Sequence, residues 1–217
     1  MALAIFDLDN TLLGGDSDYL WGEYLVENKH VDSHNFQQAN QDFYDQYVAG
    51  TMDIFEFLAF QLKPLADNDI QLLEQWRADY LKQKINPIIL PAAHKLIEKH
   101  TQQNDTLLII TATSRFITAP IAVKLAIPNL IATEPEMKNG QYTGAVAGTP
   151  SFQQGKVTRL KAWLADNQHS LEGSYFYSDS HNDLPLLELV SHPVAVDPDP
   201  QLTETAQQRG WPILSLR

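Results

Sequence analysis

Two patterns of apolar positions alternate along most of this chain. Short runs of consecutive apolar residues, such as Ala-Leu-Ala-Ile-Phe at 2–6, predict strands that are buried on both faces. Stretches in which apolar residues recur every three to four positions predict helices with one buried face. We expect strands at 2–6, 107–110, 130–133, 175–177, 194–196 and 213–216, and helices at 91–100, 115–125, 156–164, 184–190 and 201–209.

The alternation of strand and helix defines the expected fold class. It predicts an α/β protein with a Rossmann-like core of three layers, in which helices cover both faces of a parallel sheet. Asn139-Gly140, between Met137 and Tyr142, predicts an additional β-hairpin. In sheets of this kind, ligands bind at the carboxyl ends of the strands.

Residues 14–88 interrupt this alternation with four predicted helices and no strand. We therefore predict a core domain made of 1–13 and 89–217, and a helical cap domain made of 14–88. The aromatic residues of the cap either form the core of a small helical bundle or line a pocket. The expected helices begin after Asp16 (a predicted N-cap), Asp32, Asp53 and Asp69, and the third and fourth end at Pro64 and before Pro87.

Composition excludes several classes of function. The chain has 27 acidic and 15 basic residues, a net charge of −12, which argues against a nucleic-acid partner. It contains no cysteine, so disulfides, cysteine-ligated metals and a thiol nucleophile are excluded. No apolar run reaches the roughly 20 residues that span a bilayer, and the first residues lack the basic start of a signal peptide. We expect a soluble, cytoplasmic protein with no membrane partner.

Acidic and hydroxyl side chains follow three of the predicted strands. Asp7 and Asp9 follow the first strand, Thr111 follows the strand at 107–110, and Asp179 and Asp183 follow the strand at 175–177. Because like charges held close together disfavour ionisation, such a group of carboxylates calls for a cation. Mg²⁺ prefers oxygen ligands and keeps room for a phosphate. Asp7 is then a candidate nucleophile, and Asp9, two residues on, a candidate general acid and base.

A phosphoryl group also needs hydrogen-bond donors and positive charge around its oxygens. Thr111 offers a hydroxyl, and Lys156 offers a fixed charge at the start of a predicted helix, after Gln153-Gln154-Gly155. The backbone amides of the turn after Asp7 are a third source of donors.

These segments resemble the four motifs of the haloacid dehalogenase superfamily, in its order and spacing. The insert at 14–88 resembles the C1 cap of that family. The chain is most similar to the phosphoserine-phosphatase-like subclass IB, whose members include histidinol phosphatases and phosphoserine phosphatases. The motifs that carry the resemblance are Asp7-Leu8-Asp9-Asn10-Thr11, Thr111, Lys156 and Asp179-Ser180-His181-Asn182-Asp183.

The resemblance assigns the reacting and metal-binding roles. Asp7 is implied to be the nucleophile and a Mg²⁺ ligand. Asp9 is implied to protonate the leaving alcohol and then to activate water, with its main-chain carbonyl oxygen on Mg²⁺. Asp179 is implied to ligate Mg²⁺ directly, with Asp183 behind it in the same metal site. Dehalogenases of the superfamily lack the second aspartate of the first motif, so Asp9 favours phosphoester chemistry.

The resemblance also assigns the phosphate-binding roles, to Thr111, Ala112 and Lys156, with Asn182 near the phosphate. We interpret His181, between these residues, as a variable loop position, because Mg²⁺ sites prefer oxygen ligands.

The chain departs from phosphoserine phosphatases where those enzymes bind their substrate. They use a glutamate at the cap entrance for the amine and a cap arginine for the carboxylate. The matching acid here is Asp16, and the one arginine of the cap, Arg77, matches no motif. Thr111-Ala112-Thr113-Ser114-Arg115 replaces their Ser-Gly-Gly turn, which predicts either that Arg115 lies near the site or that it is a surface helix residue.

The charge of the cap suggests a substrate class. Residues 14–88 hold thirteen acidic and five basic residues, with Asp16 and Asp18 at the predicted entrance. One hypothesis is that these acids select a phosphate ester that carries a cation and no carboxylate, such as L-histidinol phosphate. The other is that they form a solvated helix face.

The sequence therefore predicts a Mg²⁺-dependent phosphomonoester hydrolase that forms an aspartyl-phosphate. The small-molecule substrate is expected to be an amino-alcohol phosphate. Alternatives are a phosphoserine phosphatase, a regulatory protein that binds phosphorylated metabolites without hydrolysis, and a phosphotransferase. A protein phosphatase is disfavoured, because a cap that closes over the site would exclude a folded partner.

Overall fold

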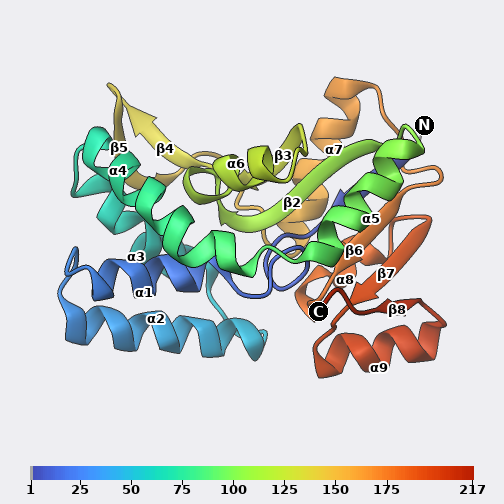
Figure 1. The fold of residues 1–217 in the computed structure, drawn as a ribbon, viewed down its shortest axis with the longest axis horizontal. Helices are drawn as coiled ribbons and strands as arrows, with labels where there is room; N and C mark the ends of the chain where they lie inside the picture. Colours follow the sequence, from blue (N-terminus) through green and yellow to red (C-terminus); the bar gives the residue numbers. More distant parts are fainter. Residues whose placement is uncertain (1) are drawn as a thin grey trace.

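The centre of the protein is a parallel sheet of six strands in the order β3-β2-β1-β6-β7-β8 (Figure 1). The structure is a computed structural model and describes residues 2–217. Every neighbouring pair of strands in this sheet runs parallel. The strands are β1 (Leu3–Phe6), β2 (Thr106–Ser114), β3 (Asn129–Thr133), β6 (Tyr175–Ser178), β7 (His192–Val196) and β8 (Ile213–Leu214).

Both faces of the sheet are buried, as the apolar runs predict. Ala4 and Phe6 of β1 belong to the apolar cluster on one face, and Leu3 and Ile5 belong to the cluster on the other. This alternation follows from the two-residue period of a strand. The first cluster includes residues of α5 (Pro91–Gln102) and α6 (Arg115–Lys124); the second includes residues of α7 (Gln154–Asn167), α8 (Leu184–Leu187) and α9 (Pro200–Arg209). The predicted three-layer α/β core is thus confirmed.

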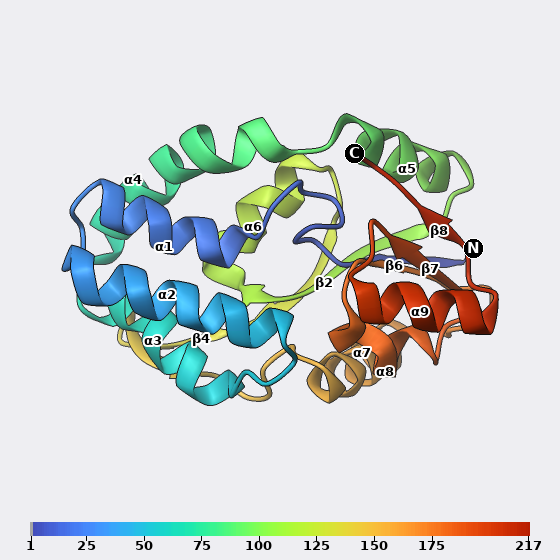
Figure 2. The ribbon, with the colours of Figure 1, turned by 90° about the horizontal axis from the view of Figure 1, so that it is seen from below.

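The helices between β1 and α5 form a separate group beside the sheet (Figure 2). The hairpin predicted at Asn139-Gly140 is present as β4 (Pro135–Lys138) and β5 (Gln141–Val146), and β5 packs against α3. Asn139 and Gly140 both have positive φ, of 52° and 80°, as a tight hairpin turn requires. The helices are α1 (Ser17–Glu27), α2 (Ser33–Val48), α3 (Ile54–Ala66) and α4 (Ile70–Tyr80).

Several predicted boundaries were wrong by a few residues. Helix α3 continues two residues beyond Pro64, whose side chain is buried against the core. Because Pro64 lies in the last turn, it removes a single helical hydrogen bond near the end of the helix. After α4, helical backbone continues through Pro87 as a π-helical turn at Leu81–Ile85 and a 3-10 turn at Asn86–Ile88.

Two of the four aspartates expected at helix starts act as caps. Asp16 accepts a hydrogen bond from the backbone N–H of Tyr19 at 2.8 Å. Asp53 accepts from the N–H groups of Phe55 at 2.8 Å and Glu56 at 3.2 Å. In the described part of the chain, the side chains of Asp32 and Asp69 make no capping hydrogen bond, although each occupies the N-cap position.

Within residues 2–217, no helix is both long enough and apolar enough to span a membrane.

The two kinds of N-cap provide a matched test of helix stability. We expect Asp53→Ala to lower the free energy of unfolding by about 1 kcal/mol, because two backbone N–H groups of α3 lose their acceptor. Asp32→Ala should change it by less than roughly 0.5 kcal/mol, since no capping bond is lost. Urea denaturation of both variants measures the difference, and equal losses would contradict the capping assignment.

Candidate active site

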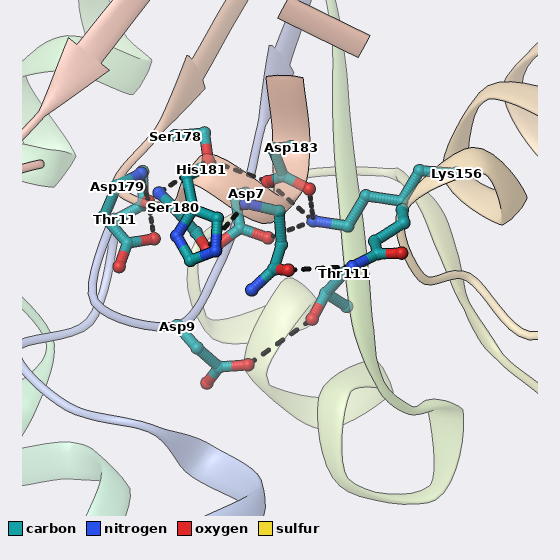
Figure 3. A network of polar contacts seen from close by, with 12 residues as sticks. Asp7, Asp9, Thr11, Thr111, Lys156, Ser178, Asp179, Ser180, His181 and Asp183 are labelled. Atoms are coloured by element: carbon teal, nitrogen blue, oxygen red, sulfur yellow. Dashed lines mark hydrogen bonds and ion pairs between the residues drawn. The ribbon is translucent and has the colours of Figure 1, made fainter. Parts of the chain in front are cut away.

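The acidic strand ends meet at one edge of the sheet (Figure 3). Asp7 directly follows β1, and Asp179 directly follows β6, the neighbour of β1. Thr111 and Thr113 lie in the last part of β2, the other neighbour of β1, where the pairing with β3 shifts register between Ile110 and Ser114. The topology therefore brings together motifs that are far apart in the sequence.

Lys156 forms a buried ion pair with two aspartates. Its Nζ donates to Asp7 Oδ1 at 2.7 Å and to Asp183 Oδ2 at 2.8 Å. Ser178 Oγ donates to the same Oδ2 of Asp183 at 2.7 Å. Burial alone lowers the pKa of Lys156, but the charges of Asp183 and Asp7 outweigh this and raise it, so the lysine is protonated. Lys156 thus supplies a permanent positive charge beside Asp7.

The local backbone positions Lys156 at the start of α7. Gln153, the residue before the helix, has a φ of 45°, a left-handed conformation that is costly for a residue other than glycine. Gly155 lies so close to the preceding loop that a Cβ atom would stand 2.0 Å from the carbonyl oxygen of Pro150. The Gln-Gln-Gly-Lys segment therefore needs its glycine to bring the lysine to the strand ends.

Asp9 is held by groups from both the helical insert and the core. Its Oδ1 accepts from the backbone N–H of Ser17 at 2.7 Å, at the start of α1. Its Oδ2 accepts from Thr113 Oγ1 at 2.8 Å and, more weakly, from Thr111 Oγ1 at 3.4 Å. Burial and the charge of Asp16 raise the pKa of Asp9 to about 6, within the range that suits a group that gives and takes protons near neutral pH.

Asp179 is fixed by Thr11 of the first motif. Thr11 Oγ1 donates to Asp179 Oδ1 at 3.2 Å and accepts from the backbone N–H of Asp179 at 3.1 Å. Burial and the charges of Asp7 and Asp183 raise the pKa of Asp179 well above its usual value. Burial also raises the pKa of Asp7, to about 7, against the opposing charge of Lys156.

The oxygen atoms at this edge of the sheet are of the kind that Mg²⁺ prefers as ligands. The carboxylates of Asp7 and Asp179 and the main-chain carbonyl of Asp9 are all oxygen ligands, and a cation would relieve the repulsion between the two carboxylates. Asp183 faces Lys156 and Ser178 instead. Within residues 2–217, no three acidic or histidine side chains form a ready-made metal cluster. A bound Mg²⁺ would thus draw on the main chain, water and phosphate, as this ion commonly does.

A cavity lies above these residues, between the core and the helices α1–α3. The core contributes a polar floor, and the helices contribute two acids and several aromatic side chains. Among the residues expected from sequence, those that line it are Asp7, Asp9, Asp16, Asp18, Thr111, Ala112, Lys156, Asn182 and Asp183. The aromatic residues that line it are Tyr19, Phe43, Tyr44, Tyr47, Phe57 and Phe152.

Of the two alternatives for Arg115, its contacts agree with the second, a helix residue outside the cavity. Its Nε donates to both carboxylate oxygens of Glu134, at 2.8 and 2.9 Å, and its Nη2 donates to the carbonyl of Leu130 at 2.8 Å. These contacts turn the side chain toward β3 and away from the cavity. Arg77 is also engaged elsewhere: its Nη1 donates to the carbonyl of Phe116 at 3.0 Å, and its guanidinium lies over the Phe116 ring.

His181 is held by a core residue outside the cavity. Its Nδ1 lies 2.8 Å from Asp199 Oδ2, and its backbone N–H donates to the same oxygen at 2.7 Å. This agrees with the interpretation of His181 as a loop residue. Its neighbour Asn182 instead links core and helices, because its Nδ2 donates to the carbonyl of Tyr47 at 3.2 Å and its Oδ1 accepts from Gln153 at 2.9 Å.

Sequence reasoning missed Thr113 and did not decide the role of the aromatic residues. Thr113 stands two residues after Thr111 in β2, a spacing that places both side chains on one face of a strand, and this signal was available. The aromatic residues of α2 recur at helical spacing, which is equally typical of a bundle core. The structure divides them: Trp21, Tyr24 and Tyr80 pack together in the core, whereas Tyr44 and its neighbours line the cavity.

Known proteins resemble this chain over most or all of its length. Residues 4–188 match the model of the haloacid dehalogenase-like hydrolase family. A histidinol-phosphatase of Neisseria meningitidis serogroup C (strain 8013) is 43% identical over 99% of both chains. A crystal structure of a protein of unknown function from Bordetella pertussis Tohama I superposes with a TM-score of 0.94 at 40% identity, over 100% of this chain and 99% of that one.

The same architecture occurs in a phosphoserine phosphatase solved as an analogue of its phospho-aspartyl intermediate. That structure superposes with a TM-score of 0.73 over 100% of this chain and 93% of the other, at 17% identity, a likeness of fold. The chain belongs to the haloacid dehalogenase-like hydrolases. It is a phosphatase of that family.

Lys156 allows a test of the buried ion pair. With metal removed by EDTA, Lys156→Met is expected to lower the free energy of unfolding by about 3–5 kcal/mol, because Asp7 and Asp183 are left buried without their partner. Lys63→Met is the control: Lys63 pairs with Asp67 on the surface, and its loss should cost at most about 1 kcal/mol. Denaturant unfolding measures both, and similar losses in the two variants would disprove the structural role of Lys156.

Proposed function

We propose that this protein is a Mg²⁺-dependent phosphomonoester hydrolase that acts on a small phosphorylated metabolite through an aspartyl-phosphate on Asp7. The observation that carries the proposal is the pairing of two differently held carboxylates at one cavity. Asp7 has a permanent cation, Lys156, at 2.7 Å. Asp9 is oriented by Thr113 and by the start of α1, and its raised pKa suits proton transfer.

The proposed first step transfers the phosphoryl group to the protein. A carboxylate oxygen of Asp7 attacks phosphorus and the bond from phosphorus to the ester oxygen breaks, while Asp9 gives its proton to the leaving alcohol. Lys156 and Thr111 bind the phosphoryl oxygens, with Ala112 and Asn182 at the same end of the cavity. Mg²⁺, held by Asp7, Asp179 and the main-chain carbonyl of Asp9, would supply further positive charge against these oxygens.

The proposed second step releases phosphate. Asp9, now a carboxylate, takes a proton from a water molecule as the water oxygen attacks phosphorus. The bond from phosphorus to Asp7 then breaks, and inorganic phosphate leaves with both aspartates restored. Asp9 can serve both steps because its hydrogen bonds from Thr113 and Ser17 fix one position for it.

The helices of residues 14–88 act in this proposal as a cap on a core of 1–13 and 89–217. Support comes from the two points where the chain passes between these parts, since Leu13 and Ile89 form an antiparallel bridge. Further support comes from the cavity, which is lined from both sides. Closing such a cap over the site would exclude bulk water and large partners.

The substrate we favour is an amino-alcohol phosphate such as L-histidinol phosphate. In the described part of the chain, Lys156 is the one basic side chain that lines the cavity, and it is occupied by Asp7 and Asp183. The cap side presents Asp16 and Asp18 instead, which suits a cationic group. The aromatic wall suits a flat ring such as imidazole, and the histidinol-phosphatase of Neisseria meningitidis is 43% identical.

Phosphoserine is the second candidate substrate. Its carboxylate would need a basic partner on the cap side, and the arginines that could provide one, Arg77 and Arg115, are engaged with other residues. A purely regulatory binding protein is disfavoured, because such a role would need neither Asp7 as nucleophile nor Asp9 in position for proton transfer.

Replacing the nucleophile tests the covalent mechanism. Asp7→Asn is expected to lower kcat for phosphate release by roughly 10⁴-fold or more, because an amide is a far poorer nucleophile than a carboxylate. Asp67→Asn, which removes an exposed carboxylate of the cap, should leave the rate unchanged. Colorimetric phosphate release measures both variants, and wild-type turnover by Asp7→Asn would rule out the aspartyl-phosphate.

Substrate choice is tested by steady-state kinetics with added Mg²⁺. We expect kcat/KM for L-histidinol phosphate to exceed that for L-phosphoserine by at least roughly tenfold, since the extra carboxylate of phosphoserine meets aspartates without a free cation. A screen of sugar and nucleotide monophosphates, with alcohols added as acceptors, detects other substrates and phosphoryl transfer. Equal or better turnover of phosphoserine would contradict the charge argument.

A further inference from the structure

Asp18 is a buried carboxylate with one oxygen that accepts no hydrogen bond within the described residues. It lies in the first turn of α1, is 7% exposed, and lines the cavity. Within the described residues, its Oδ1 is fully buried and has no hydrogen-bond partner. A buried acceptor without a donor costs free energy, so a partner from outside the chain is expected when the site is filled.

No donor within the described residues reaches Oδ1 of Asp18. Ser17 Oγ and Gln61 Oε1 are also buried and unpartnered within residues 2–217, and the side-chain amide of Gln61 is used on the main-chain carbonyl of Asp18, at 2.9 Å. The hydroxyl of Thr113, from the core, donates to Asp9 Oδ2. The missing partner is thus a donor, and the excess of negative charge favours a cationic one.

Asp16 has a different task, although it is the acid that matches the amine-binding position in the resemblance to phosphoserine phosphatases. Its Oδ1 caps α1 through the N–H of Tyr19. A carboxylate that already accepts from the end of a helix has part of its charge compensated by the helix dipole. Asp18 lies two residues further along, in the same first turn, and its Oδ1 accepts no hydrogen bond from the helix or from any other group within residues 2–217.

We propose that Asp18 accepts the ammonium group of the substrate and so selects phosphate esters that carry a cation next to the reacting phosphate. This inference rests on the proposed function and sharpens it, because it assigns amine recognition to Asp18 and leaves Asp16 as a helix cap. Asp18 is a specificity residue in this proposal: it touches the part of the substrate that does not react.

The test compares two variants on two esters. The esters are L-histidinol phosphate and its analogue without the amine, 3-(imidazol-4-yl)propyl phosphate. Asp18→Asn is expected to lower kcat/KM for the amine-bearing ester by roughly 30-fold or more, with the analogue changed by less than about threefold. Asp16→Asn removes the same charge and keeps a capping side chain; because its charge acts on Asp9 and not on the amine, it should change kcat/KM for both esters by the same factor, to within about threefold.

Each alternative result has a distinct meaning. If Asp18→Asn affects both esters equally, or if Asp16→Asn is the variant that loses the amine-bearing ester selectively, the assignment of Asp18 is overturned while the proposed function stands. If the wild-type protein hydrolyses neither these nor other phosphate esters, the proposed function fails and the assignment fails with it.

A second measurement does not depend on how the variant folds. Inhibition of the wild-type protein is compared for L-histidinol and 3-(imidazol-4-yl)propan-1-ol, using hydrolysis of p-nitrophenyl phosphate as the readout. We expect L-histidinol to have an inhibition constant at least roughly tenfold lower, because it alone carries the ammonium group. Equal inhibition by the two alcohols would overturn the proposal.

Discussion

The buried contact of Lys156 with Asp7 and Asp183 is the constraint on which the rest of the site depends. It joins the end of β1, the start of α7 and the loop after β6, three segments that the sequence keeps far apart. An ammonium group buried among carboxylates is stable only when all partners are in place, so the three segments have to assemble together. The strained backbone of Gln153 and the close approach of Gly155 to Pro150 place the charged end of Lys156 beside these two aspartates.

A second link couples the helical insert to the chemistry. Asp9 accepts hydrogen bonds from the first turn of α1 and from β2, so its position depends on how the helices sit on the sheet. Asn182 makes a second contact between the core and the helices, because its side-chain amide donates to the carbonyl of Tyr47 in the last turn of α2. Movement of the helices away from the core would break both contacts and release the carboxylate of Asp9.

The acidity of the chain separates into parts with different physical roles. At the strand ends, Asp7 and Asp183 are paired with Lys156. At the start of α1, Asp16 caps the helix, whereas one oxygen of Asp18 is buried without a partner within residues 2–217. Most of the other acids of residues 14–88, such as Asp32, are exposed to solvent. The net charge of −12 therefore comes from buried acidic residues around the cavity as well as from exposed ones.

The sequence by itself determined the parallel sheet, the helical insert and half of the residues that line the cavity. Strand runs, helical periodicity and short motifs can be recognised because they depend on neighbours a few positions away. Tertiary structure alone decided the direction of Arg115, which follows its pairing with Glu134, and the division of the aromatic residues between core and cavity. It also decided that Asp16 accepts a capping hydrogen bond, whereas Oδ1 of Asp18, two residues on, has no partner within residues 2–217. These outcomes depend on which side chains the fold brings together from distant segments, and no local pattern encodes that choice.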